Sequence, residues 1–382
     1  MRRVPARWRL RCAAVALCSL AAAAQTGAQQ RDTAAARLRG GEPWKTDFSR
    51  RAVRSGEIVS GGPPKDGIPA IDRPRFETVR SADRWLAARD PVMVVEHGAA
   101  VTAYPLSILI WHEIVNDRVG GLPVAVTFCP LCNTALVFDR RLDGRVLDFG
   151  TTGRLRRSDL VMYDRQTETW WQQATGGAIV GTLVGRKLTR VPSATLAWRT
   201  VKELHPDVRV LSRETGFDRP YGRNPYRGYD TGRPLSEFFF GEADPRLPVM
   251  ERVAAVELGN GWAAPLTELR KVGVAHAVVA GTPLAVFWSP GAASALDRSS
   301  ISEGRDVGQT AVYDRRVAGR TLTFARAGGG FRDRETGSGW TLAGRAVSGP
   351  LRGQRLRAIP HGDHFWFAWV AFRPETEVWS TR

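Results

Sequence analysis

The sequence contains few cysteines, which limits the number of disulfides or cysteine-based metal sites that it can form. Only four of the 382 residues are cysteine, and two of these, Cys12 and Cys18, lie within the first 24 residues. A chain of this length can bury an adequate hydrophobic core, so it does not need disulfides or metals merely to fold. The remaining pair, Cys129 and Cys132, therefore requires another explanation.

Several familiar motifs are also absent. The sequence has no P-loop, no dinucleotide-binding glycine fingerprint, no HExxH helix and no GxSxG elbow. Asn133 follows the second cysteine of CPLC, where a haem attachment motif requires histidine. Beyond the first 24 residues no stretch of about 18 apolar residues occurs, so we expect no stable membrane span in the mature chain.

Lysine is scarce as well, and nearly all of the positive charge is arginine. The formal net charge is +17, but five of these charges lie in the first 24 residues, which leaves +12 spread along the rest. No lysine- or arginine-rich run reaches the density of a binding patch. We therefore expect a solvated basic surface and no nucleic-acid partner.

The amino terminus has the pattern of a secretory signal peptide over residues 1–24. A basic segment precedes the apolar stretch from Cys12 to Ala24, and small residues allow cleavage near residue 24 or 28. This pattern predicts a periplasmic or secreted protein. Cys18 follows Leu17 rather than a small residue, which disfavours a lipoprotein anchor. Residues 25–65 lack periodicity and predict a flexible arm.

Most of the following chain reads as strands joined by tight turns. Hairpins are predicted around His97 and Gly98, around Asp143 and Gly144, and across residues 165–168. Another hairpin pairs residues 110–115 with 123–128, which would place His112 on a strand beside the one that delivers Cys129. Helices are predicted from Ser81 to Ala88 and, capped by Ser193, over residues 194–205. The aromatic run after His361 predicts a core strand.

The chain repeats itself, and the repeat predicts its architecture. Ten residues between Pro105 and Leu136 recur 160 positions later, between Pro265 and Leu296. We therefore predict an α+β, predominantly β fold with two homologous halves. The first repeat covers residues 66–215, a linker or binding loop rich in Tyr, Gly and Pro covers 216–250, and the degenerate second repeat covers 251–382.

The second copy lacks the candidate site. Cys129 corresponds to Ser289, Cys132 to Ala292, and His112 to Val272, whereas the turn proline persists. A pair of cysteines needed to hold the turn should have been kept in both copies. This comparison favours a functional role for CPLC.

We expect CPLC to be a thiol–disulfide redox pair, because two cysteines in an oxidising compartment are readily oxidised; the alternatives are a metal ligand set and a structural disulfide in an interaction protein. Pro130 and Leu131 suit the centre of a β-turn, and Asn133 suits the left-handed conformation that follows, so both sulfurs should lie on one side. A disulfide closing so short a loop would contribute only about 2 kcal/mol. In the redox reading Cys129 and Cys132 exchange electrons with a protein or small-molecule thiol partner, and His112 lowers the attacking thiol's pKa.

In the metal reading the same residues bind copper or zinc. Two cysteines and His112 leave a tetrahedral zinc site incomplete, so Glu113, Asp117, His97 or Met162 would have to complete it. Cuprous ion needs fewer ligands, and Met162 would suit it. The simpler interpretation of Met162 is core packing. The supporting residues predicted around the site are Glu113, Asn116, Asp117, Trp170 and Gln172.

These segments together resemble a known family. DGIPAID, YPLSILIWHEIVND, PVAVTFCPLCNTALVFDR, LVMYDRQTETWWQ, YGRNPYRGY and HFWFAWVAFRPET are similar to the bacterial domain-of-unknown-function family 3179, over roughly Asp66 to Glu375. Some members of that family are described as selenoproteins, which would favour redox chemistry if selenocysteine falls in the CPLC segment. The resemblance extends to His112, Glu113, Asn116, Asp117, Cys129 and Cys132, and it implies no settled activity.

Overall fold

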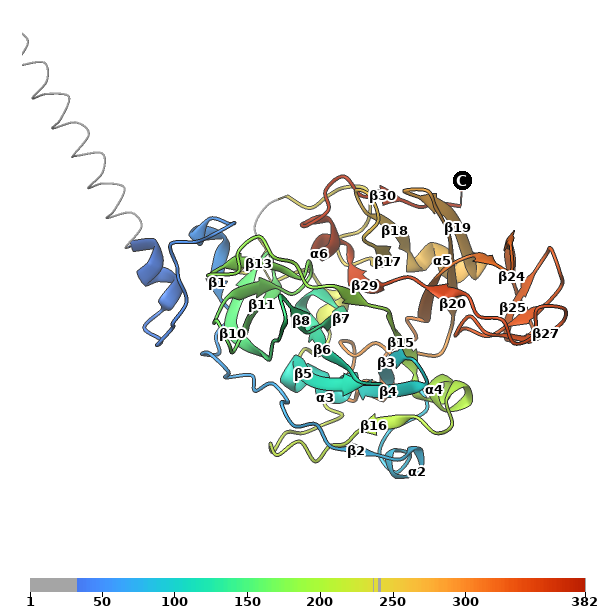
Figure 1. The fold of residues 1–382 in the computed structure, drawn as a ribbon, viewed down its shortest axis with the longest axis horizontal. Coiled ribbons are helices and arrows are strands. Elements are labelled where there is room, and N and C mark those ends of the chain that lie inside the picture. The colour runs from blue at the N-terminus through green and yellow to red at the C-terminus, as the bar shows by residue number, and fades with distance from the viewer. Residues whose placement is uncertain (1–32, 236, 240–241, 382) are drawn as a thin grey trace, which may run out of the picture.

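Strands dominate the protein, as the sequence predicted. The computed structural model describes residues 33–235, 237–239 and 242–381, and the predicted signal peptide lies outside these residues. In Figure 1 the cyan and green strands of the first half lie beside the orange and red strands of the second. Within the described residues no helix has the length and hydropathy needed to cross a bilayer.

The first half contains three larger sheets. Their strand orders are β15-β3-β4-β16-β2, β14-β7-β6-β5 and β1-β10-β11-β12-β13. The strands are β1 (Ile58–Ser60), β2 (Phe76–Glu77), β3 (Pro91–His97), β4 (Ala100–Pro105), β5 (Ile114–Val119), β6 (Leu122–Cys129), β7 (Thr134–Asp139), β10 (Phe149–Arg156), β11 (Asp159–Asp164), β12 (Trp170–Gln172), β13 (Gly177–Val180), β14 (Arg190–Val191), β15 (Ser193–Ala197) and β16 (Arg209–Leu211). A small hairpin joins β8 (Arg141–Leu142) to β9 (Arg145–Val146).

The second half also contains three larger sheets, in the orders β29-β17-β18-β30, β28-β21-β20-β19 and β24-β25-β26-β27. The strands are β17 (Arg252–Val256), β18 (Trp262–Pro265), β19 (Val274–Val279), β20 (Thr282–Ser289), β21 (Gln309–Asp314), β24 (Phe324–Ala327), β25 (Gly330–Asp333), β26 (Gly339–Trp340), β27 (Ala346–Ser348), β28 (Arg357–Ala358), β29 (His361–Phe365) and β30 (Glu377–Val378). A small hairpin joins β22 (Arg316–Val317) to β23 (Arg320–Thr321).

The order of elements in the two halves agrees. The sheet β15-β3-β4-β16 matches β29-β17-β18-β30, and in each sheet the last pair of these strands is parallel whereas the others are antiparallel. Helix α3 (Leu106–His112) has a counterpart 160 positions later in α5 (Leu266–Val272). Each helix begins after a proline and ends at a residue with left-handed φ, Glu113 in the first half and Gly273 in the second.

Helix α3 corrects one prediction. Residues 110–115 were predicted as a single strand, but the helix continues to His112 and β5 begins only at Ile114. The segment from Leu106 to Trp111 is a short apolar run, and such a run fits a buried helix as well as a buried strand. His112 therefore lies at the end of a helix and not on the strand that pairs with β6.

Three other boundaries also differ from the predictions. Helix α2 (Val79–Ala82) is capped by Thr78, and Ser81 lies inside it. Residues 193–197 form β15, so α4 (Trp198–Leu204) starts later than predicted. The aromatic run at the carboxyl end is a strand only to Phe365 and then forms α6 (Trp366–Val370). In these three segments the sequence pattern is compatible with either a helix or a strand at the boundary. Packing against neighbouring elements then decides which one forms.

The hydrophobic core is shared between the halves. The largest cluster surrounds β6 and β7 and also contains Leu296 and Phe365 from the second half. A separate cluster packs residues 33–60 of the predicted arm on β11 to β13, where Leu38, Trp44 and Phe48 are buried. The described part of that arm is thus packed against the first half.

Candidate functional site

The two thiols are presented by a short turn between β6 and β7. Cys129 ends β6, residues Pro130–Cys132 form a single 3-10 turn, and Asn133 follows with φ of 50°. The predicted turn, with its left-handed asparagine, is confirmed. Both cysteines are free thiols and at most 1% exposed. The Cys129 and Cys132 sulfurs lie 3.7 and 3.2 Å from one acceptor, the Ser158 carbonyl oxygen.

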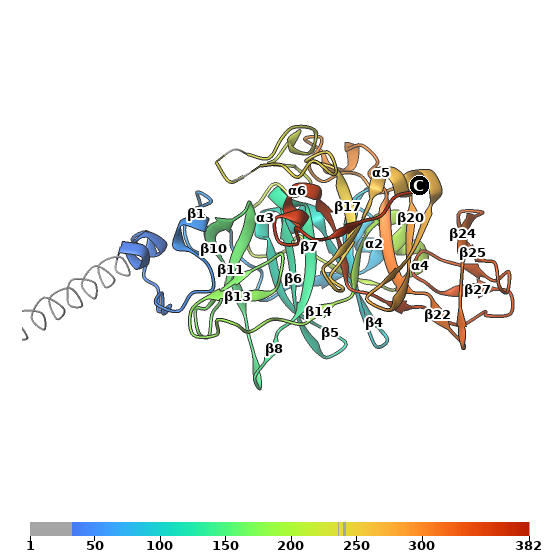
Figure 2. The same ribbon diagram turned by 90° about the horizontal axis from the view of Figure 1, so that it is seen from above.

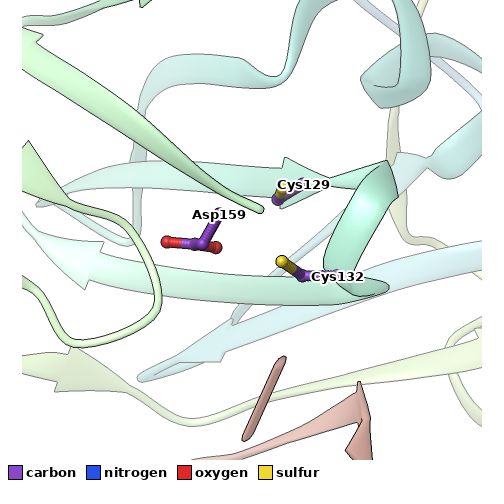
Figure 3. Close-up of side chains that lie close together, drawn as sticks. All are labelled: Cys129, Cys132 and Asp159. Atoms are coloured by element: carbon purple, nitrogen blue, oxygen red, sulfur yellow. The ribbon is translucent and has the colours of Figure 1, made fainter. Parts of the chain in front are cut away.

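A carboxyl group that sequence reasoning missed completes the cluster. One oxygen of Asp159, the first residue of β11, lies within 4.8 Å of both sulfurs, and the two sulfurs also lie within 4.8 Å of each other. Figure 3 shows its carboxyl group lying opposite the two thiols. The hairpin β10–β11 carries it there, although Asp159 lies 27 residues after Cys132 and 30 after Cys129 in the sequence. Its only sequence signal is an acid at the start of an apolar strand.

The Asp159 carboxyl group is held firmly on one side only. Its Oδ2 accepts hydrogen bonds from Gln172 Nε2 at 2.6 Å and from the Ala174 backbone N–H at 2.8 Å. Its Oδ1 is buried and accepts no hydrogen bond from an N–H or O–H group among the described residues, and the Cys132 thiol is the neighbouring group that interacts with this carboxyl group. Burial raises the pKa of Asp159 to about 7, and the two hydrogen bonds partly oppose that rise. Gln172, predicted as a supporting residue, thus contacts the site through Asp159.

A second buried acid, Glu113, lies beside this cluster. Burial raises the pKa of Glu113 to about 8, and the charge of Asp159 adds to the effect. Its φ is 58°, which costs a residue with a Cβ about 1 kcal/mol or more. The corresponding residue of the second half is Gly273, for which that conformation is unstrained. Glu113 therefore has both a burial cost and a backbone strain that Gly273 does not have.

The two thiols are buried beside the same acids, and their pKa values are raised as well. Burial raises the pKa of Cys132 well above its ordinary value, and the nearby Cys129 raises it further. Burial also raises the pKa of Cys129, to which the charges of Asp159 and Glu113 contribute. Burial therefore disfavours the charged form of all four groups, although the charge of Arg190 partly opposes this at Asp159, whose pKa of about 7 leaves it partly ionised at pH 7.

His112 makes its contacts elsewhere. Its Nδ1 lies 2.7 Å from the Pro69 carbonyl oxygen, and its Nε2 lies 2.6 Å from the Tyr221 hydroxyl. The carbonyl fixes the tautomer with the proton on Nδ1, so Nε2 accepts the hydrogen bond from Tyr221. Burial lowers the pKa of His112. Both ring nitrogens are engaged by these two partners rather than by the thiols.

The other predicted residues have mainly structural contacts. Asn116 joins β5 to β10 through two hydrogen bonds with the Phe149 backbone. Asp117 accepts a hydrogen bond from Tyr104 at 2.5 Å and pairs with Arg209 at 3.1 Å. Trp170 packs in the cluster that contains Trp44, away from the cysteines. Met162 is fully buried in the same hydrophobic cluster as the thiols.

The tyrosine-rich segment covers the site. Tyr229 donates a hydrogen bond to the Leu131 carbonyl oxygen at 3.0 Å, and Ser158 Oγ donates to the Phe238 carbonyl oxygen at 2.9 Å. The charge of Glu113 adds to burial in raising the pKa of Tyr226. In Figure 2 this yellow-green segment runs along one edge of the molecule, near the orange loop that follows β20. The backbone of Asn224 bonds that loop at Ser299.

The fold and the site together define a predominantly β protein with a buried dithiol–carboxyl cluster beneath an aromatic segment. The chain belongs to the family described as protein of unknown function (DUF3179), whose model matches residues 65–376. No curated protein and no solved structure gives a significant match. The match confirms the resemblance inferred from the motifs.

Proposed function

We propose that this protein binds a thiophilic divalent metal ion, of the zinc class, through Cys129, Cys132 and Asp159. The observation that carries the proposal is the convergence of two sulfurs and one carboxyl oxygen within 4.8 Å, fully buried. Zinc accepts sulfur and carboxylate oxygen together, whereas cuprous ion prefers soft donors alone. The carboxylate therefore favours zinc over copper. Three protein ligands leave the fourth tetrahedral position open to a further ligand.

The hydrogen-bond arrangement of Asp159 supports the same conclusion. Gln172 and Ala174 fix one carboxyl oxygen, as outer-shell partners fix a metal ligand. The other oxygen is buried, and among the described residues no N–H or O–H group donates to it; the Cys132 thiol is the neighbour that interacts with this carboxyl group. A buried polar atom without a partner costs about 1–3 kcal/mol, and a bound cation would remove that cost.

The second candidate function is thiol–disulfide exchange, favoured by the closeness of the two sulfurs. Cys129 and Cys132 would lose two electrons and two protons to form a disulfide, and a partner disulfide would be reduced to two thiols. Such thiols need a lowered pKa and access to the partner. Here burial and acidic neighbours raise both thiol pKa values, and the aromatic segment would have to move.

Comparison with the second half supports the view that the two cysteines and Glu113 serve the function of the protein rather than its folding. We infer that the two halves arose by internal duplication, because the strand orders and the 160-residue spacing of α3 and α5 agree. In the second half Ser289 and Ala292 replace the cysteines, and Gly273 replaces Glu113. The hairpin corresponding to β10–β11 ends after fewer residues. The second half therefore has the same order of strands but lacks the thiols and the acids.

Export is the remaining part of the proposal. The signal-peptide pattern supports a periplasmic or secreted location, where two free thiols are readily oxidised. A metal bound at the thiols would protect them against oxidation in that compartment. The metal would then be captured with both cysteines reduced, before or soon after translocation.

Elemental analysis of protein purified without a tag tests the proposal. We expect about one zinc ion per chain, and loss of that metal in Cys129→Ser, Cys132→Ser and Asp159→Asn. Met162→Leu serves as the control, since it keeps zinc in our proposal and weakens a copper site that uses the thioether. A protein purified under reducing conditions that neither contains nor takes up zinc contradicts the proposal.

A redox titration of the same protein separates the alternatives. A metal-free disulfide with a potential between about −120 and −270 mV would support exchange chemistry. A potential below about −300 mV would instead indicate a structural disulfide in an interaction protein.

A further inference from the structure

A cavity of about 320 Å³ lies between the two halves, away from the thiols. Its walls come from β3 and β15 of the first half and from β21 and residues 342–361 of the second. Much of the lining is apolar, and Leu196, Ala311 and Leu356 are each at most 5% exposed. This volume is at the lower end of the range for small-molecule sites, about 300–1,000 Å³.

One end of the cavity carries charged groups. The Glu96 carboxylate accepts hydrogen bonds from Arg355 at 2.5 Å and from Arg345 at 3.1 Å, both on the same oxygen. Two guanidinium groups therefore face one carboxylate, and the local charge is positive. The Arg355 side chain is 47% exposed, which places it at the mouth, whereas the apolar walls are buried.

Two nitrogen atoms at this end have no hydrogen-bond partner among the described residues. His205 Nε2 is buried and lies 3.5 Å from the second oxygen of Glu96 without a hydrogen bond to it, and Arg345 Nε is also buried. Burial lowers the pKa of His205, so the ring is neutral at pH 7 and the arginines determine the local charge. Arg355 uses only one of its terminal nitrogens on Glu96, which leaves N–H groups directed elsewhere.

We propose that this cavity binds a small monoanion with an apolar body, a short aliphatic or aromatic carboxylate. The carboxylate would accept hydrogen bonds from Arg355 at the mouth, because guanidinium geometry matches a carboxylate. The apolar body would contact Leu196, Ala311 and Leu356. The excess positive charge excludes a cationic ligand and selects an anion over its neutral analogue.

The site is independent of the proposed metal centre. Neither cysteine nor Asp159 lines the cavity, so a metal-free protein should still bind the carboxylate. Because the cavity exists only in the folded chain, binding should also raise the melting temperature.

Calorimetric titration of the full mature chain with hexanoate, hexanamide and hexylamine tests this assignment. We expect saturable binding of hexanoate, at least tenfold weaker binding of hexanamide, and none of hexylamine. Arg355→Gln should weaken hexanoate binding at least tenfold, whereas Arg352→Gln, on an exposed arginine outside the cavity, should not change it. Ala311→Leu should reduce binding by filling the cavity.

Three results would overturn the proposal. They are no hexanoate binding at 10 mM, equal binding of the amine or the amide, and unchanged binding in Arg355→Gln. If Ala311→Leu fails to fold, the Arg355 variant still decides the question, since its side chain is half exposed and outside the core.

Discussion

Asp159→Asn should stabilise the metal-free protein while abolishing its tight zinc binding. Asparagine has the same shape as aspartate, and its carbonyl oxygen can accept the hydrogen bonds from Gln172 and Ala174. What it removes is the buried negative charge. The substitution should therefore raise the free energy of unfolding of the metal-free protein and lower its affinity for zinc. A variant that is merely misfolded would lose both.

The magnitude follows from the pKa. In the folded chain the Asp159 pKa rises from 3.8 to about 7, somewhat over three units, and each unit corresponds to about 1.4 kcal/mol. A raised carboxyl pKa means that the folded state holds its proton more tightly than the unfolded state. At pH 4 the penalty for ionisation is small; it grows as the pH rises from about 4 to about 7, and then levels off. The full difference is about 4 kcal/mol, an upper limit because the site can relax.

Urea unfolding of the two proteins between pH 4 and pH 8, after treatment with a chelator, measures this difference. We expect nearly equal stability at pH 4, and an advantage for Asp159→Asn that grows to between about 2 and 4 kcal/mol at pH 8. Calorimetric titration with zinc should show at least 100-fold weaker binding for the variant. A variant that is less stable at pH 8, or that binds zinc as the wild type does, would refute the reasoning.

Three further predictions concern the same site. Glu113→Gly should be more stable than the matched Glu113→Gln by about 1 kcal/mol in urea unfolding, because only glycine relieves the φ of 58°; equal stability would contradict the strain. Zinc affinity, measured by competition with a chelator, should fall steeply as the pH is lowered from 8 to 6, since the metal displaces about two to three protons; an unchanged affinity would be inconsistent with ligation by Asp159 and the thiols. Tyr221→Phe removes the 2.6 Å hydrogen bond to His112, worth about 1 kcal/mol, so an aromatic disulfide reagent should modify the two buried thiols about fivefold faster; an unchanged rate would show that the aromatic segment does not control access.

The sequence determined the features that depend on local chemistry. Pro130 and Asn133 specify the CPLC turn within a few residues, and the hairpins around Gly98 and Gly144 follow from turn preferences. The 160-residue spacing predicted which elements recur, and the order of strands in the two halves agrees with it. Each of these features depends on residues that are neighbours in the sequence, or can be found by comparing the sequence with itself.

Tertiary structure decided the composition of the site. Asp159 reaches the sulfurs only because the turn between β10 and β11 packs against the CPLC turn, where both sulfurs contact the Ser158 carbonyl oxygen, and no spacing in the sequence records that approach. His112, adjacent to Glu113 in sequence, contacts Pro69 and Tyr221 because it lies at the end of α3 and not on the strand that pairs with β6. The raised pKa values of Glu113 and Asp159 likewise arise from desolvation, which depends on what packs around a carboxyl group and not on its neighbours in the chain.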